Sequence, residues 1–528
     1  MSSSTKKDAW GTRVGIILAV TGSAVGLGNF LRFPGQAAQY GGGAFLIPYL
    51  VAFLIIGLPL AWLEWGLGRY GGARGHNSAP GIFRSLIGRP SGSYLGMLGT
   101  VMPVMIYMYY VFVEAWCLAY AWDYLTGTFT AFGGDSGAIT AHFLSSTGAA
   151  ADGSMFGREA GRMFVFLSIC FGLNFFLIYR GIHKGIEGFC NVAMPLLFLC
   201  AVVVLVRVLT LPANPVNPEQ NIINGLGYMW NPVKEGSTLW QTLSRSEVWL
   251  AATGQIFFSL SLGFGLILTY ASYLKEDDDV ALSSLTSVSG NGFAEVVLGG
   301  MIAIPAAFVF LGPAVVQSPP GTFGMGFITL PNVFNLMPGG AFFGFLFFFL
   351  LFLAAVTSSI SMLQPAIALL EEGLGLTRKP AVAILGFITL AGCLFIVYFS
   401  KDFAALDTVD FWMANFFIFI FATAQTIVFG WVLGVNKGFE ELKRGAEITL
   451  PESLKFVIKY ISPSFLLIVF AVWCYQELPG RLKAIVTLPE EGPPIVLMSV
   501  GLILLVLAFF TLVVARANQK WSKEEKAS

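Results

Sequence analysis

Charged residues are scarce in this chain. Only 11% of its 528 residues are Asp, Glu, Lys or Arg, whereas a soluble domain carries about 25%. Lys+Arg and Asp+Glu both number 30, so no net charge directs the chain to nucleic acid or to an acidic partner. Hydrophobic residues make up 56% and include 49 Phe. This composition excludes an ordinary soluble domain and indicates a protein of the lipid bilayer.

Residues for metal or catalytic centres are equally few. The three His are scattered and no nucleophile–base set accompanies them, so we predict that the chain is not an enzyme. The six Cys lie in or beside apolar segments without metal-ligand spacing, which predicts small core residues rather than disulfides. A Walker motif is absent, so ATP is not the predicted energy source. The first residues lack the order of a signal peptide, and the first apolar segment is expected to remain in the chain.

Long apolar runs dominate what is present. Because about 20 apolar residues cross a bilayer, we predict an all-α membrane protein with twelve transmembrane helices. They lie near residues 13–38, 43–68, 94–124, 162–179, 189–210, 247–274, 281–312, 340–370, 380–400, 405–434, 453–475 and 494–515. An even number of spans places both termini on one side, where most Lys and Arg then fall. The positive-inside rule predicts cytoplasmic termini, in the inner (plasma) membrane of a cell.

The first apolar segment is interrupted at its centre. Residues 22–29, GSAVGLGN, place three glycines and an Asn at membrane depth, and Arg32 and Pro34 follow. Irregular backbone is tolerated inside a bilayer only where protein buries it or where it lines a cavity. A broken helix leaves carbonyls free to hold a cation and amides free to hold an anion. The break therefore predicts a binding site.

The sixth segment has the same anomaly, with SLSLGFG at residues 259–265. One such segment is explained as well by a Gly-rich packing face between membrane helices. Two of them, five segments apart, favour a transporter built from inverted repeats. We predict a single domain over 1–528, with repeats at 1–210 and 245–435 and two additional helices within 450–516. The uncharged outer loop 313–339 is expected to pack down as a lid.

Several motifs resemble the neurotransmitter:sodium symporter family. They are GSAVGLGNFLRFP from Gly22, GGGAFLIPY from Gly41 (after Tyr40, where the family has Asn), GQIFFSLSLGFG from Gly254, AAVTSSISMLQP from Ala354 and LDTVDFW from Leu406. The resemblance covers nearly the whole chain. It implies discontinuous helices 1 and 6 and secondary-active symport by alternating access, driven by the Na⁺ gradient.

The resemblance also implies two Na⁺ sites made of oxygen donors. The first site, completed by the carboxylate of the substrate, consists of Ala24, Asn29, Ser259 and Asn291. The second consists of Gly22, Val25, Ala354, Thr357 and Ser358. For the two hydroxyls of the second site the structural alternative is a hydrogen bond to their own helix.

Gly26 implies the class of substrate. Amine-transporting relatives carry an Asp at this position, so a Gly here suits a ligand that brings its own carboxylate, and we expect a neutral, hydrophobic amino acid. Tyr110 is expected to bind that carboxylate. The implied substrate site comprises Ala24, Gly26, Gly28, Ile106, Tyr110, Phe258, Ser261, Phe264, Ser358 and Met362. An apolar pocket discriminates one methylene by only ~1–3 kcal/mol, so the preferred amino acid is not predicted.

Glu295 lies where chloride-dependent relatives have Ser, with Tyr49 and Gln255 at the positions of the other chloride partners. The resemblance thus implies independence from Cl⁻, with Glu295 able to take up a proton when the empty carrier returns; a purely structural hydrogen bond is the alternative. Arg32 and Asp410 are expected to form the outer gate as a direct or water-bridged pair.

On the inner side the family pairs an Arg with an Asp, and this chain offers Lys7 and Glu372. A proton-coupled transporter of related fold is the nearest rival, but the hydroxyl and amide residues of the Na⁺ sites argue against it. A ligand-gated channel or a receptor is a further alternative, without a polar pore stripe or a signalling domain to favour it. The expected partners are an amino acid, Na⁺ and lipid, with a homodimer left open.

Overall fold

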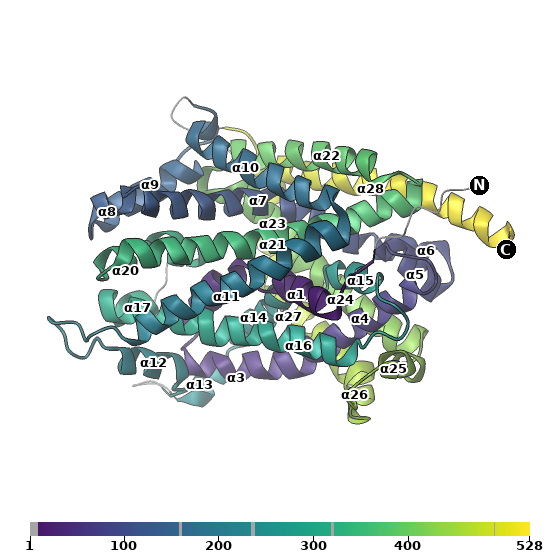
Figure 1. Ribbon diagram of the computed structural model, residues 1–528, viewed down its shortest axis with the longest axis horizontal. Coiled ribbons are helices and arrows are strands. Elements are labelled where there is room, and N and C mark those ends of the chain that lie inside the picture. Colours follow the sequence, from purple (N-terminus) through teal and green to yellow (C-terminus); the bar gives the residue numbers. More distant parts are fainter. Residues whose placement is uncertain (1–8, 158–160, 234–237, 318–320, 490–491, 528) are drawn as a thin grey trace.

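The computed structural model describes residues 9–157, 161–233, 238–317, 321–489 and 492–527, and these residues form a bundle of helices. In Figure 1 the long helices run along the horizontal axis. The short helices α5 (Ala79–Ile87), α25 (Val435–Lys443) and α26 (Ser453–Phe456) gather at one end of that axis, and α8 (Thr128–Phe132) and α12 (Ile222–Trp230) lie toward the other. Connections that alternate between two ends are the arrangement required of a membrane bundle.

The first five predicted segments are helical. Their elements are α1 (Arg13–Ala24), η1 (Gly28–Arg32) and α2 (Phe33–Gln39); α3 (Gly43–Ala52), η2 (Phe53–Gly57) and α4 (Leu58–Gly72); α6 (Pro90–Gly96) and α7 (Leu98–Leu125); α10 (Gly161–Tyr179); and η5 (Ile182–Glu187) with α11 (Gly188–Leu209). The axis bends by 46° between Arg13–Ala24 and Gly28–Gln39. The predicted break in the first helix is therefore present.

The remaining segments are α14 (Ser246–Leu260) and α15 (Leu266–Ala271); α16 (Ala281–Gly292), η6 (Phe293–Gly300) and α17 (Met301–Leu311); α21 (Gly340–Leu374); α22 (Arg378–Tyr398); α23 (Ala404–Asp410), η9 (Phe411–Phe417), α24 (Ile418–Ile427) and η10 (Val428–Val432); α26, η11 (Val457–Ile461) and α27 (Ser462–Val486); and α28 (Ile495–Ala527). Within the described residues, 10 helices are long and apolar enough to span a membrane, or 11 with the bent pair. The sixth predicted segment is divided at residues 261–265, so neither half is long enough alone.

Between the spans lie α9 (Ser136–Thr147), η3 (Ser154–Phe156), α13 (Leu239–Leu243), α18 (Pro313–Gln317), α19 (Gly321–Gly324), η7 (Met325–Thr329), α20 (Leu330–Leu336) and η8 (Lys401–Phe403). The uncharged loop before α21 packs inward as predicted. Phe327 and Leu330 are buried, and the Tyr120 hydroxyl donates to the Phe327 carbonyl at 3.2 Å. The loop thus packs against the C-terminal part of α7.

Burial separates the central helices from the peripheral ones. Nearly all of α7 is buried, and it packs along much of the length of α21. A helix that is apolar on all sides belongs in the interior of a bundle. By contrast, α27 and α28 expose large side chains such as Ile468 and Leu505, which suits contact with lipid. Both broken helices contact this buried pair, since α1 and α15 pack against α21.

Candidate substrate and ion site

The backbone of the first break is held by side chains instead of helical hydrogen bonds. After α1 ends at Ala24, Val25 is extended, with ψ 91°. The Gly26 amide donates to the side-chain oxygen of Asn29 at 2.9 Å, and the Leu27 amide donates to the Tyr110 hydroxyl at 3.4 Å. Both amides lie in the interior, so these contacts satisfy groups that would otherwise be unpaired.

The second break requires left-handed backbone. Ser261 has φ 54°, Gly263 has φ 75° and Gly265 has φ 81°. The Ser261 hydroxyl donates to the Ser23 carbonyl at 2.7 Å, which joins the second break directly to the first. A non-glycine residue with positive φ is uncommon and is found mostly where the surrounding structure imposes it. Ser261 is thus fixed at the junction of the two broken helices.

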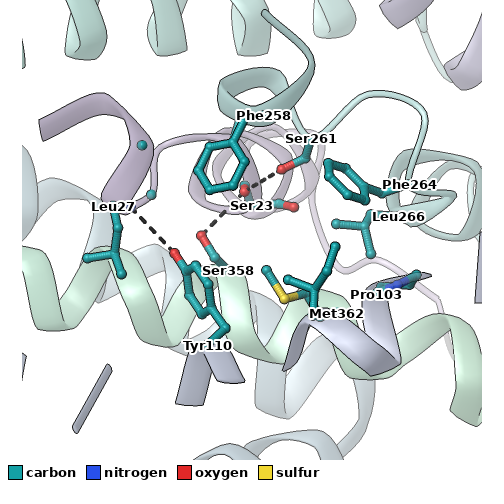
Figure 2. A pocket seen from close by; sticks show the side chains of 14 residues that line it. Ser23, Leu27, Pro103, Tyr110, Phe258, Ser261, Phe264, Leu266, Ser358 and Met362 are labelled. Atoms are coloured by element: carbon teal, nitrogen blue, oxygen red, sulfur yellow. Dashed lines mark hydrogen bonds between the residues drawn. The ribbon is translucent and has the colours of Figure 1, made fainter. Parts of the chain in front are cut away.

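The two breaks enclose a pocket against α7 and α21. Figure 2 shows Phe258, Ser261 and Phe264 on one side and Tyr110, Ser358 and Met362 on the other. All ten residues predicted for the substrate site line this pocket, together with Ser23, Leu27, Pro103 and Leu266. None of these described lining residues carries a charge. An apolar cavity with a few convergent polar groups is the usual form of a small-molecule site.

Two glycines leave the pocket open. A Cβ atom on Gly26 would lie 2.9 Å from the Ser358 hydroxyl oxygen and 3.1 Å from the Tyr110 hydroxyl oxygen. A Cβ on Gly28 would lie 2.6 Å from the ring of Phe258. Any larger residue at Gly26 would occupy the space between the two hydroxyls. The glycine therefore keeps these polar groups accessible to a ligand.

Oxygen atoms from three of the four residues predicted for the first Na⁺ site converge beside the pocket, whereas the side-chain oxygen of the fourth, Asn29, accepts from the Gly26 amide. The terminal amide of Asn291 lies 3.1 Å from the carbonyl oxygens of both Ala24 and Ser259. The Asn29 amide donates to Asn291 at 2.8 Å. With the Asn291 oxygen toward the two carbonyls, three oxygens meet without a proton between them, which a cation would stabilise. With its nitrogen toward them, the amide donates to both carbonyls instead.

Four residues of the second predicted set, Gly22, Ala354, Thr357 and Ser358, also meet where α1 packs against α21. The Ser358 hydroxyl lies 3.4 Å from the Gly22 carbonyl oxygen and donates to the Ala354 carbonyl at 3.0 Å. The Thr357 hydroxyl also donates to Ala354, at 3.0 Å. Both hydroxyls thus bond to their own helix, the structural alternative recognised from the sequence. A hydroxyl that donates its proton keeps lone pairs for a cation, so this geometry is compatible with an ion.

Comparison with known proteins identifies the family. A family model described as "Sodium:neurotransmitter symporter family" matches residues 7–132 and 152–519. The chain belongs to this family. The protein is therefore a sodium-dependent transporter of the membrane.

Similar proteins align with most of this chain. An uncharacterised sodium-dependent transporter of Methanocaldococcus jannaschii is 29% identical over 470 residues, which cover 87% of this chain and 89% of the relative. The sodium-dependent serotonin transporter of Drosophila melanogaster is 26% identical over 508 residues, 90% of this chain and 78% of that protein. The crystal structure of MhsT in complex with L-phenylalanine matches with a TM-score of 0.73 and 26% identity, over 88% of this chain and 99% of that one.

The transporter buries Glu295 in a polar cluster next to the first break. The Tyr49 hydroxyl donates to one carboxylate oxygen at 2.5 Å, and the side-chain amide of Gln255 donates to the other. Gln255 also donates to the Gly28 carbonyl at 3.4 Å. The three residues predicted to form the chloride-substituting group therefore lie in contact, and Gln255 connects them to the backbone of the substrate pocket.

The outer gate was expected as a direct or water-bridged pair, and the direct pair is not formed. No ion pair joins Arg32 and Asp410, both among the described residues, although both line one outer cavity of about 260 Å³. Arg32 instead donates to the Gly254 carbonyl at 3.1 Å and lies over the ring of Phe258. Asp410 accepts a hydrogen bond from the Tyr109 hydroxyl at 2.6 Å. Each charge has closer partners on its own side of the cavity.

Glu372, the acid expected for the inner gate, has partners near the start of α5. Its carboxylate accepts hydrogen bonds from the Asn77 and Ser78 amides at 2.9 and 2.8 Å and contacts His76 at 2.6 Å. It therefore caps the start of α5. Lys7, its expected partner, lies outside the described residues.

Three buried glutamates were missed in the sequence. Glu64 accepts a hydrogen bond from the Gly263 amide in the second break at 2.9 Å. Glu114 accepts from the Ser359 hydroxyl at 2.5 Å, one residue beyond the second predicted ion set. Glu187 binds the residues that precede α1. All three lie within or beside an apolar segment, which is the signal that pointed to Glu295. That signal could have identified them, because buried carboxylates in membranes are costly and usually functional.

Proposed function

We propose that this transporter imports a neutral, hydrophobic amino acid together with Na⁺ and without a requirement for Cl⁻. The observation that carries the proposal is the uncharged pocket between the two breaks, which gathers all ten residues implied for the substrate. The solved relative MhsT, of similar fold, is in complex with L-phenylalanine. An apolar, aromatic-lined pocket with polar groups at one end suits an amino acid of that kind.

In this proposal Tyr110 and the amides of the first break bind the substrate carboxylate. The ammonium group is bound by carbonyl and hydroxyl oxygens at Ser23, Ser261 and Ser358, which lie together in Figure 2. Ile106, Phe264 and Met362 contact the apolar side chain. The absence of an ionised group from the described lining disfavours acidic and basic substrates, because a buried unpaired charge is costly.

We assign two Na⁺ ions to the two oxygen clusters. In the first cluster the carboxylate of the substrate completes the coordination of the ion beside Ala24 and Asn291, so each ligand strengthens the binding of the other. The second ion joins Gly22 and Val25 of the first broken helix to Ala354, Thr357 and Ser358 of α21. This ion would hold the moving helix against the rigid one.

Glu295 replaces chloride in this scheme. Its carboxylate supplies the negative charge beside the first cluster, and it takes up a proton when the empty carrier returns. The hydrogen bonds from Tyr49 and Gln255 suit an ionised carboxylate, which only accepts. We further propose two inverted five-helix repeats, cytoplasmic termini and a plasma-membrane location, with a homodimer as the assembly to test.

Uptake into proteoliposomes tests the proposal. Purified protein is reconstituted, and radiolabelled neutral, acidic and basic amino acids are supplied with Na⁺ or K⁺ outside and with Cl⁻ or gluconate as the anion. We expect uptake of neutral, hydrophobic amino acids in Na⁺ only, at the same rate in gluconate, and abolished by a Na⁺ ionophore. Equal uptake in K⁺ would refute the Na⁺ assignment and favour the proton-coupled rival.

A further inference from the structure

The N-terminal end of α1 rests on one carboxylate. Glu187 accepts hydrogen bonds from the Gly11 amide at 2.7 Å, from the Thr12 amide at 3.0 Å and from the Thr12 hydroxyl at 2.9 Å. His183 approaches the same carboxylate with Nδ1 at 2.8 Å. The Glu187 side chain is only 2% exposed. A carboxylate at this position satisfies the unpaired amides of a helix start and complements the helix dipole.

The fit around this carboxylate is close. A Cβ atom on Gly15 would lie 2.1 Å from a Glu187 carboxylate oxygen, and one on Gly11 would lie 2.2 Å from the His183 ring. The Thr12 hydroxyl, which donates to Glu187, also accepts from the Gly15 amide at 2.9 Å. Gly11 and Gly15 therefore lie directly against the His183 and Glu187 side chains, with no room for a larger residue at either position.

Glu187 itself stands at a joint between helices. It is the last residue of η5, directly before α11, and follows Gly185 by two residues. A Cβ on Gly185 would lie 2.0 Å from the Leu177 carbonyl oxygen of α10, so only glycine permits this approach. The π-helical turn η5 is less regular than the α-helices on either side, and such turns often occur at functional sites. Local unwinding of η5 would withdraw the carboxylate from α1.

The other acids near the start of α1 are weaker candidates for holding this helix in place. The acid expected for the inner gate, Glu372, already caps α5. Arg13 pairs with Asp279 at 2.9 Å and with Glu447 at 2.5 Å, but its side chain is 37% exposed and that of Glu447 60%. Exposed ion pairs contribute little, because solvent screens them and pairing restricts two long side chains. The Trp10 indole, just before α1, also donates to the Tyr270 carbonyl at 2.9 Å. Among the carboxylates that contact residues 11–13, Glu187 is the one that binds the backbone of this helix start from a shielded position.

We propose that Glu187 is the cytoplasmic latch of the transporter, meaning the residue whose hydrogen bonds keep the inner half of the first broken helix against α11. The inference rests on the proposed function, since alternating access requires α1 to leave this position when substrate is released inward. Departure of α1 strips two amides and a hydroxyl from a buried carboxylate, and water must enter to replace them. The latch therefore sets the balance between inward-closed and inward-open states.

Amide hydrogen exchange measures this balance directly. Wild-type protein, Glu187→Ala and Glu187→Gln are compared in Na⁺ and in K⁺, and exchange is followed in peptides that cover residues 10–24. We expect about tenfold faster exchange in Glu187→Ala and an intermediate rate in Glu187→Gln, which retains one acceptor oxygen. Peptides from α22 serve as an internal reference and should not change.

Glu447→Ala is the matched control, because it removes another acid in contact with the start of α1. It should leave exchange and uptake within about twofold of wild type. If Glu187→Ala does not fold, as judged by size-exclusion chromatography, Glu187→Gln alone decides. Unchanged exchange in residues 10–24 of the folded variant would overturn the proposal, as would acceleration spread equally over α22.

Uptake of radiolabelled L-phenylalanine separates the two proposals. We expect Glu187→Gln to lower Na⁺-driven accumulation at least about threefold while retaining measurable Na⁺-dependent binding. The reason is that the inward-open state becomes more populated, so accumulated substrate returns through the carrier. Wild-type protein without Na⁺-dependent uptake of L-phenylalanine or of any other neutral, hydrophobic amino acid would refute the proposed function, whereas normal wild-type uptake with an unaffected variant would refute only the latch.

Discussion

The Tyr110 hydroxyl offers the sharpest test of the substrate site. Tyr110 is buried on α7, and its hydroxyl faces the first break, where it accepts from the Leu27 amide at a long 3.4 Å (Figure 2). The hydroxyl proton is not used in this bond, so it is available to a carboxylate. Tyr110→Phe removes this one oxygen atom and keeps the ring that fills the wall of the pocket.

The expected size of the effect follows from the charge of the substrate. A hydrogen bond to an ionised group contributes ~1.5–3 kcal/mol, and each ~1.4 kcal/mol is tenfold in affinity. Tyr110→Phe should therefore weaken amino-acid binding about 10- to 150-fold. Folding should be destabilised by no more than about 1–3 kcal/mol, the cost of leaving the buried Leu27 amide without its long, 3.4 Å partner.

Equilibrium binding of a radiolabelled amino acid at saturating Na⁺ gives the affinity, and thermal unfolding gives the stability. Tyr107→Phe is the matched control: it lies on the same helix, is equally buried, and its hydroxyl accepts from Asn174 at 3.4 Å, away from the pocket. The reasoning is refuted if Tyr110→Phe changes the affinity by less than about threefold, or if Tyr107→Phe weakens it as much.

Three further substitutions test the remaining groups. Gly26→Ala puts a methyl group 2.9 Å from the Ser358 hydroxyl oxygen, and we expect at least about tenfold weaker amino-acid binding in an equilibrium assay. Thr357→Val keeps the shape but removes an oxygen, so the Na⁺ concentration for half-maximal uptake should rise about tenfold, and an unchanged value would contradict the second ion site. Glu295→Ser removes the fixed negative charge, so uptake should become dependent on Cl⁻ when gluconate is the comparison anion; Cl⁻-indifferent uptake would count against the assignment.

The two breaks were predictable from sequence because their pattern is local. Glycines inside an apolar run permit the breaks at residues 22–29 and 259–265, and the membrane allows such breaks only where protein buries them. The pocket residues on α7 and α21 followed from the family resemblance instead, because nothing local connects those helices to the breaks. Ser23, Leu27, Pro103 and Leu266 also line the pocket and were not identified as substrate residues.

The gates were less predictable because they depend on competition between partners. Arg32 has a carbonyl at Gly254 and an aromatic face at Phe258 within reach, both from the second broken helix. These contacts lie more than 220 positions away in the chain, and the sequence does not rank them against Asp410. A charged side chain at the edge of a cavity binds whichever partner the nearby backbone brings within reach. A sequence motif does not contain that information.

Several acids that are shielded from solvent have the same physical role, both at the breaks and near the expected gates. Glu64 accepts the Gly263 amide within the second break, Glu187 accepts the amides before α1, and Glu372 accepts those before α5. In each case a carboxylate pairs with backbone N–H groups that no helix satisfies, so the cost of burying the charge is offset by bonds that the fold needs. A chain with so few charges has therefore placed three of its acids where helices start or stop. Those are also the places that must loosen for the transporter to change state, because a hydrogen bond from a side chain can be exchanged for water without unravelling a helix.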